Sequence, residues 1–145
     1  MKKSFQTRSA AATMKAAADF SKRLAGGEVV ALYGDLGAGK TVFAKGVAKG
    51  LGIADELTSP TFIVMNEYAG GALRLCHYDM YRVDAENARN LGLHENFGRP
   101  DTVCVVEWPE NIGALLPENA IKIYIGGDGK ERQIKIGKTV LRGGK

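Results

Sequence analysis

The chain lacks any long hydrophobic run, and this shortage excludes several classes of protein. No stretch of its 145 residues approaches the roughly 18 consecutive apolar residues of a membrane-spanning helix, so we expect no membrane association. The first 24 residues have neither the apolar core nor the cleavage site of a secretory signal. We therefore expect a cytoplasmic protein.

Cysteine is also scarce. The chain has two, Cys76 and Cys104, and each lies inside an apolar run of strand length. There is no C-x-x-C motif, and no group of cysteine and histidine has the spacing of a metal site. We therefore predict buried, reduced thiols rather than a cysteine-based metal centre.

The net charge of +4 is concentrated at the C-terminal end. Residues 121–145 contain seven Lys or Arg and two Asp or Glu, whereas residues 1–120 contain 13 and 14. One interpretation is a basic edge that contacts RNA or an acidic partner. The favoured alternative is a solvated edge strand protected by lysines. The length of the chain and its lack of linkers predict one domain over residues 1–138, followed by a loose basic tail at 139–145.

Short apolar runs alternate with helical patterns along the chain, which predicts an α/β domain. Two glycine-containing connections, at 69–71 and 126–129, join apolar runs as in β-hairpins. We therefore expect a central mixed parallel and antiparallel sheet, flanked by helices in a three-layer fold. The expected helices are 11–24, 41–51 and 84–91, the last with Asp84 as its N-cap, and the expected strands are 4–7, 28–33, 62–68, 73–80, 102–107, 121–125 and 133–136.

A glycine-rich loop follows the apolar run at 28–33. Residues 34–41, GDLGAGKT, fit the phosphate-loop pattern G-x-x-x-x-G-K-[ST] in full, with a strand expected before them and a helix after them. Glycines let the backbone curl so that successive N–H groups face a phosphate chain, and the helix start adds positive potential. This pattern predicts a nucleotide site in a P-loop NTPase-like fold. Its candidate residues are Gly34, Asp35, Leu36, Gly37, Ala38, Gly39, Lys40 and Thr41.

Two of these side chains have specific chemical roles in such a loop. The Lys40 ammonium can neutralise the β- and γ-phosphates, and the Thr41 hydroxyl can ligate Mg²⁺. The site also needs an acid near the metal at the end of a second strand. Asp79 suits this role by residue type, and Glu107 suits it because it follows the more uniformly apolar run VCVV. Spacing alone does not separate them, and both could face the γ-phosphate, one at the metal and one orienting water.

Several residues near these acids have two interpretations each. His77 lies two residues before Asp79 and so on the same sheet face; a hydrogen-bonded structural histidine is favoured over one that orients the site. For Trp108 two interpretations have equal weight: it covers a nucleotide or a partner, or it is a partly buried aromatic residue of the core. Arg82 is more simply a surface arginine than a phosphate contact. Thr61, in the loop SPTF, is a candidate γ-phosphate sensor.

Two motifs typical of GTPases, one that reads the base and one in a switch, are missing. GTPases of this superfamily usually carry N-K-x-D and D-x-x-G, and neither occurs here. ATP is therefore the expected nucleotide, together with Mg²⁺. A small-molecule kinase needs an acceptor pocket and a lid, for which the chain has no spare segment. A kinase and a non-catalytic nucleotide-gated adaptor are the alternatives to a minimal ATPase.

Five motifs resemble, in order and spacing, those of the TsaE family, also called YjeE. They are YGDLGAGKT, SPTF, HYDMYR, LGLHENF and EWPE. The resemblance runs from about residue 13 to residue 132, and the E-W-P and H-x-D-x-Y-R elements are more distinctive than the phosphate loop. It implies a Mg²⁺-dependent ATPase of bacterial tRNA threonylcarbamoyladenosine biosynthesis, weak alone and regulated by its partners.

The resemblance also implies partners and residue roles. It implies a cytoplasmic protein that joins TsaB and TsaD, the proteins that modify tRNA, and that hydrolyses ATP to reset their complex between turnovers. By analogy Thr41 and Glu107 hold Mg²⁺, Asp79 is needed for hydrolysis, and Arg132 lies near the nucleotide. tRNA is reached through the complex, with the basic C-terminal segment as a candidate contact.

Two segments resemble the switch loops of the family, residues 59–61 and the residues around Trp108. The chain departs from the family pattern at residues 10–12, which are alanines where polar, often acidic residues are common. The basic tail after Ile136 has no clear family counterpart.

Overall fold

The strands of the molecule form one continuous sheet. The computed structural model describes residues 4–35, 39–58, 64–127 and 131–137. Within these residues the strand order across the sheet is β1-β7-β6-β2-β5-β4-β3. The strands are β1 Ser4–Thr7, β2 Val29–Tyr33, β3 Met65–Gly70, β4 Leu73–Asp79, β5 Thr102–Glu107, β6 Ile121–Gly126 and β7 Arg132–Ile136.

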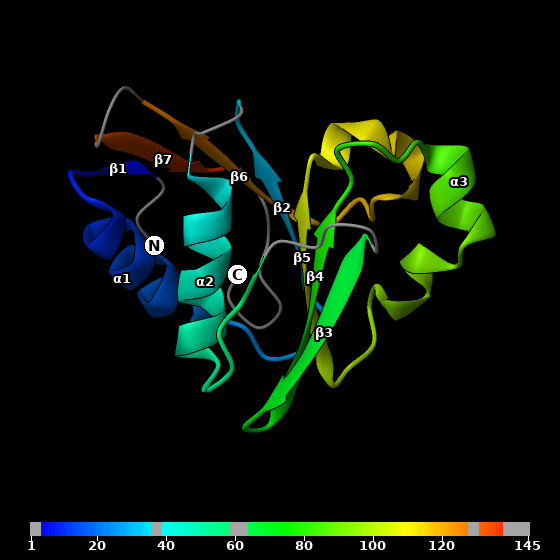
Figure 1. Cartoon of the computed structure of the whole chain (residues 1–145), viewed down its shortest axis with the longest axis horizontal. Coiled ribbons are helices and arrows are strands. Elements are labelled where there is room, and N and C mark those ends of the chain that lie inside the picture. Colours follow the sequence, from blue (N-terminus) through cyan, green and yellow to red (C-terminus); the bar gives the residue numbers. More distant parts are fainter. Residues whose placement is uncertain (1–3, 36–38, 59–63, 128–130, 138–145) are drawn as a thin grey trace.

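Helices cover both faces of this sheet. Helices α1 and α2 lie side by side on one face, and α3 lies on the other (Figure 1). The predicted three-layer α/β fold is therefore confirmed. The helices are α1 Ala10–Ser21, α2 Lys40–Gly50 and α3 Ala85–Asn90, with short 3₁₀ helices η1 Leu93–Asn96, η2 Pro109–Asn111 and η3 Gly113–Leu115.

The sheet is parallel at its centre and antiparallel at its edges. Strand β2 pairs in parallel with β5 and β6, and β4 pairs in parallel with β5. The hairpins β3–β4 and β6–β7 and the pairing of β1 with β7 are antiparallel. This confirms the predicted mixed sheet. Strand β5 is buried along its whole length, and β2 along all but its last residue, which explains why their sequences are continuous apolar runs.

Two hydrophobic clusters fill the space between the layers. The cluster under α1 and α2 contains Phe20, Phe43 and Val47 from the helices and Val30 and Val105 from the sheet. The cluster on the opposite face joins the sheet to α3 and the 3₁₀ helices; it includes Cys76, Tyr78, Met80, Ala88, Leu93, Cys104 and Ile112.

Alternation along β4 and β5 separates polar groups between these two faces. Register pairs are His77 with Val105 and Asp79 with Glu107, so these side chains share the α2 face, whereas Cys104 faces the opposite cluster. Both cysteines are free and buried, as the sequence predicted. A hydrogen bond with Cys76 together with burial raises the pKa of the Cys104 thiol.

Most element boundaries agree with the sequence, and the differences are local. Asp84 caps α3 as predicted, because its Oδ1 accepts a hydrogen bond from Asn87 N at 2.8 Å. Helix α1 ends at Ser21 rather than at Leu24, because the following residues form tighter turns, in which Leu24 N donates to Ser21 O at 3.0 Å. The three 3₁₀ helices were not predicted. No helix in the described part of the chain is long and apolar enough to cross a membrane.

Candidate functional site

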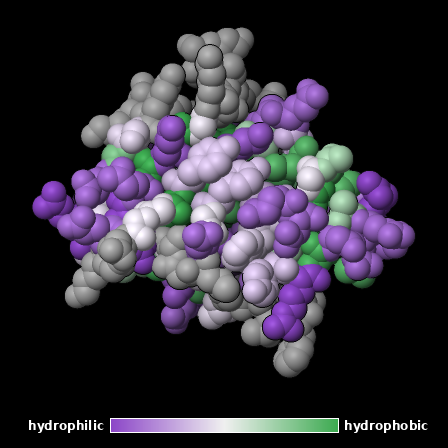
Figure 2. Space-filling model, turned by 90° about the horizontal axis from the view of Figure 1, so that it is seen from above, coloured by the Kyte–Doolittle hydropathy of each residue, from purple (hydrophilic) through white to green (hydrophobic). Residues whose placement is uncertain are grey.

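The candidate site lies where β2 leads into the glycine-rich loop and α2 begins. Helix α2 starts at Lys40, with Gly39 as its N-cap in the left-handed region at φ 100°, a conformation that glycine adopts without strain. Strand β5 lies beside β2, with Leu32 in register with Glu107, so β5 ends next to the loop. This end of the molecule is mainly hydrophilic, and apolar side chains show only in small, separate areas (Figure 2). The predicted loop residues Leu36, Gly37 and Ala38 lie outside the described residues.

The Lys40 side chain folds back onto the loop. Its Nζ donates a hydrogen bond to the carbonyl oxygen of Gly34 at 2.5 Å and lies 3.4 Å from the ring centroid of Trp108. Burial lowers the pKa of Lys40 below its usual value, and the carboxylates of Glu107 and Glu110 act in the opposite direction. The ammonium is thus held between the carbonyl oxygen of Gly34 and the face of the Trp108 ring.

Thr41 and Glu107 meet across the gap between α2 and β5. The Thr41 hydroxyl donates to the Glu107 carboxylate, with Oγ1 at 3.3 Å from Oε1 and 3.1 Å from Oε2. Glu107 is 5% exposed, so its charge is almost withdrawn from solvent. A buried carboxylate requires such partners, because leaving it unpaired is costly.

These two side chains fit a divalent magnesium ion. Mg²⁺ prefers oxygen ligands and in phosphate-loop sites takes few protein ligands, the others being water and phosphate oxygens. The donor set of one hydroxyl and one carboxylate, from Thr41 and Glu107, matches this preference. Among the described residues no group of three or more His, Cys, Asp or Glu could hold a metal ion by itself. Thr41 and Glu107 are therefore the residues that could hold a metal here, completed by a ligand's phosphates.

Asp79 lies at the same end of the sheet as Glu107, its register partner across β4 and β5. Its Oδ1 accepts a hydrogen bond from the backbone N–H of Tyr81 at 3.0 Å, which fixes the carboxylate at the strand end. Asp79 also contributes to the negative potential at Lys40. Of the two acids that the sequence left open, Glu107 contacts Thr41, and Asp79 lies beside it.

Trp108 has an unusual backbone. Its φ is 58°, and it is the one described non-glycine residue with positive φ. Such a conformation is strained for a bulky residue, and strained residues cluster at active sites, ligand clamps and switch regions. Tyr81 packs against the indole with ring centroids 5.0 Å apart, and Asn111 Nδ2 donates to Met80 O at 2.8 Å. The two strand ends after β4 and β5 are thus tied together around Trp108.

Sequence reasoning missed Tyr81 and Asn111 as supports of this arrangement. The signal that could have found Tyr81 is its place in the motif HYDMYR. In the structure its side chain is 46% exposed, so it does not serve the core. For Asn111 there was no signal, because its contact with Met80 spans 31 residues of sequence.

Arg132 reaches Gly39 from β7, which is separated from β2 by β6. It is the first residue of β7, its Nη1 donates to Glu131 O at 2.9 Å, and its side chain lies over the Cα of Gly39. The resemblance predicts that Arg132 lies near the nucleotide, and the structure places its side chain beside Gly39 at the start of α2. Arg82 is exposed, and Thr61 lies outside the described residues.

His77 lies directly beneath the candidate site. It is fully buried, and its Nε2 is 2.6 Å from Oε2 of Glu107. The sequence favoured a hydrogen-bonded structural histidine, and the structure shows that its partner is a candidate site residue.

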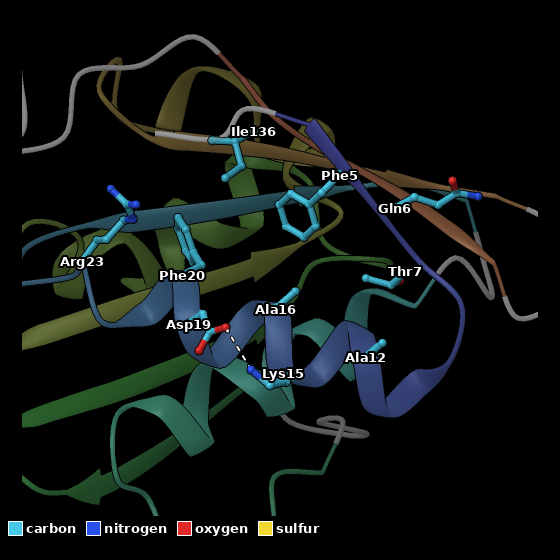
Figure 3. A pocket seen from close by; sticks show the side chains of 10 residues that line it. All are labelled: Phe5, Gln6, Thr7, Ala12, Lys15, Ala16, Asp19, Phe20, Arg23 and Ile136. Carbon is cyan, nitrogen blue, oxygen red and sulfur yellow. Dashed lines mark ion pairs between the residues drawn. The ribbon is translucent and has the colours of Figure 1, made fainter.

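A separate cavity of about 450 Å³ lies between β1 and α1. Phe5, Phe20 and Ile136 point into it, and Lys15 and Asp19 form an ion pair at 3.5 Å on its rim (Figure 3). None of its lining residues is a predicted site residue. Its lining has three charged side chains, those of Lys15, Asp19 and Arg23. It contains none of the phosphate-loop residues and neither of the candidate acids, so we do not take it as the site of phosphate chemistry.

Comparisons with known proteins agree with the geometry of the loop and the strand ends. The model of the family described as threonylcarbamoyl adenosine biosynthesis protein TsaE matches residues 7–134. The chain is 48% identical over 109 residues to the tRNA threonylcarbamoyladenosine biosynthesis protein TsaE of Bacillus subtilis, covering 74% of this chain and 68% of that one. It is 43% identical over 121 residues to the protein of the same name from Treponema pallidum, covering 82% and 87%.

A solved structure supports the same assignment. The crystal structure of YdiB from Bacillus subtilis is similar with a TM-score of 0.73 and 38% identity, over 92% of this chain and 82% of that chain. The resemblance seen in the sequence motifs is therefore confirmed by the family model, by curated relatives and by the fold. The chain belongs to the TsaE family.

Proposed function

We propose that the chain binds ATP and Mg²⁺ at the loop before α2 and hydrolyses the γ-phosphate. As a member of the TsaE family it acts in tRNA threonylcarbamoyladenosine biosynthesis. The observation that carries the proposal is the contact of Thr41 with Glu107 at 3.1 Å, at the start of the helix that follows the phosphate-loop sequence. In phosphate-loop NTPases a hydroxyl of this loop and an acid from a second strand hold the metal.

Each side chain of the site has one task in this reaction. Lys40 exchanges its contacts with Gly34 and Trp108 for the β- and γ-phosphates, whose negative charge it neutralises. Thr41 and Glu107 would hold the metal ion, which would neutralise charge on the phosphate oxygens. Asp79, at the end of the neighbouring strand, orients the water that attacks. Trp108 and Arg132 border the nucleotide.

The proposal also includes partner proteins. We propose that the chain joins TsaB and TsaD and that ATP hydrolysis resets their complex between turnovers. Slow hydrolysis by the chain alone and a large change with partners are expected, because a positioned arginine or closing surface contributes about 10³–10⁵ in rate. We also propose a cytoplasmic location, because the pathway acts on tRNA.

The deciding experiment measures free phosphate released from ATP by the purified chain, alone and with TsaB plus TsaD. We expect release that changes with the partners and that Lys40→Ala and Glu107→Ala abolish. Phosphate transferred to a small-molecule acceptor would instead indicate a kinase. ATP binding without phosphate release under any combination would indicate a nucleotide-gated adaptor and contradict the proposal.

We also propose that basic residues near the C-terminal edge assist contact with tRNA within the complex. Lys122 and Lys135 belong to β6 and β7, and residues 138–145 lie outside the described residues. Phosphate contacts release counterions, so the affinity of the complex for tRNA should fall with added salt, and more steeply for the full chain than for a chain ending at residue 137. Equal salt dependence of the two chains would contradict this contact.

A further inference from the structure

The Glu107 carboxylate has two hydrogen-bond partners that differ in kind. Thr41 donates to it from α2, and Thr41 is itself a candidate ligand of the metal ion. His77 approaches from β4 with Nε2 at 2.6 Å from Oε2, and it lies on the buried side of the carboxylate. If Thr41 binds a metal ion, its hydrogen bond to Glu107 is affected by that binding. His77 is not a candidate metal ligand, so its contact with Glu107 is independent of it.

The position of His77 follows from the sheet. Asp79 is in register with Glu107, and His77 is in register with Val105, so His77 lies diagonally one pair deeper on the same face. Diagonal neighbours in a sheet are within reach of long side chains. A glutamate at the end of β5 thereby extends back over the neighbouring histidine, and the histidine limits the directions in which the carboxylate can point.

The chemistry of the ring indicates which nitrogen carries the proton. A carboxylate only accepts hydrogen bonds, so Nε2 must donate. Within the described part of the chain, Nδ1 is buried and has no hydrogen-bond partner. The tautomer with its proton on Nε2 leaves only a lone pair unsatisfied at Nδ1, whereas a second N–H there would be a buried donor without an acceptor. The ring is therefore a one-directional donor aimed at Glu107.

We propose that His77 is a positioning residue: its Nε2–H holds the Glu107 carboxylate in the orientation that a metal ion at Thr41 and Glu107 requires. The inference rests on the proposed function, because it assumes a metal at those two ligands. Groups that orient a metal ligand typically contribute 10–100-fold in metal affinity.

The test compares His77→Leu with His77→Gln. Leucine fills a similar volume without a donor, whereas glutamine places an amide N–H close to the original Nε2. Tyr78→Phe is the matched control: Tyr78 is the next residue on β4, is also fully buried, and donates to Leu93 O at 2.8 Å on the opposite face of the sheet. It removes a buried hydrogen bond without touching Glu107.

The readouts are the affinity of Mn²⁺ for the ADP complex, measured by electron paramagnetic resonance, and the affinity for ADP without metal, measured by calorimetry. We expect His77→Leu to weaken Mn²⁺ binding about 10–100-fold and to leave metal-free ADP affinity within about twofold. His77→Gln should recover most of the loss, and Tyr78→Phe should bind Mn²⁺ as the unmodified protein does.

Three results would overturn the inference while the proposed function stands. They are Mn²⁺ binding by His77→Leu equal to that of the unmodified protein, no recovery in His77→Gln, or an equal loss in Tyr78→Phe. If the unmodified protein binds no Mn²⁺ in the presence of ADP, the metal site of the proposed function fails and this inference fails with it.

Discussion

The ammonium of Lys40 lies 3.4 Å from the ring centroid of Trp108. This contact joins the first residue of α2 to the residue after β5. A movement of the phosphate-loop lysine therefore changes the surroundings of the only tryptophan of the chain. A cation over an indole face contributes roughly 0.5–2 kcal/mol. A phosphate group that binds Lys40 must therefore displace its ammonium from the indole of Trp108.

Trp108 should consequently report nucleotide binding by its fluorescence. We expect the emission spectrum to change when ADP is titrated, because Lys40 leaves the indole for the phosphates. The Lys40→Ala variant should differ from the unmodified protein before nucleotide is added and should show no further change with ADP. Identical spectra of the two nucleotide-free proteins would contradict the contact.

Glu107→Gln tests the charge of the proposed metal ligand separately from its shape. Glutamine keeps the size of the side chain and can accept from Thr41, but it has no negative charge. We expect phosphate release to fall about 10²–10³-fold, since a metal ion contributes several kcal/mol to catalysis. ADP affinity without metal should not fall. Glu118→Gln, an exposed acid later in the same connection, is the control; an equal effect there would point to general charge rather than a ligand.

We expect the affinity for nucleotide to decrease as pH rises, and the decrease should begin at a lower pH than the pH at which an ordinary lysine loses its proton. Burial lowers the pKa of Lys40 from its usual 10.5, and phosphate binding needs the charged form. Affinity for ADP is therefore expected to be full below the lowered pKa and to be lost as pH rises through it. Lys40→Arg stays charged over this range, so its affinity, measured by calorimetry at each pH, should be flat. A parallel decrease in both proteins would assign the titration to another group.

Gly46→Ala should destabilise the fold through the contact of α1 with α2. A Cβ at Gly46 would overlap with the carbonyl oxygen of Met14 and the Cβ of Ala17. Overpacking of this kind costs about 1–3 kcal/mol, which urea unfolding measures directly. Gly126→Ala is the control, because a Cβ there meets no atom within 4 Å, and it should change stability by less than about 0.5 kcal/mol. A neutral Gly46→Ala would mean that the helices separate easily.

Much of the architecture followed from local pattern. The alternation of apolar runs with helical segments predicted the α/β class, and the glycine-containing connections predicted the hairpins now seen as β3–β4 and β6–β7. Asp84 could be assigned as an N-cap because capping depends on a residue and its next few neighbours. The 3₁₀ helices were missed because each is a single short turn with no periodic pattern.

The candidate site, like the fold, could be predicted from the sequence only in part. The phosphate-loop sequence determined by itself where Lys40 and Thr41 would lie, since the loop and the helix start are contiguous in the chain. Spacing alone did not show which of Asp79 and Glu107 contacts Thr41, because that depends on which of β4 and β5 lies beside β2, and that strand is β5.

Only the tertiary structure decided the contacts that join distant segments. His77 reaches Glu107 across 30 residues of sequence, and Thr41 reaches it across 66. Strand order and register set the first of these contacts, because hydrogen-bonded strands bring side chains together whatever their separation along the chain. The second depends on how α2 packs beside β5. The left-handed backbone of Trp108 belongs to the same group: a bulky residue adopts it only where surrounding contacts, here with Lys40 and Tyr81, compensate for the strain. The sequence thus determined that Lys40 and Thr41 lie together at the start of α2, and the packing of β4, β5 and α2 determined which acid, which histidine and which aromatic ring lie beside them.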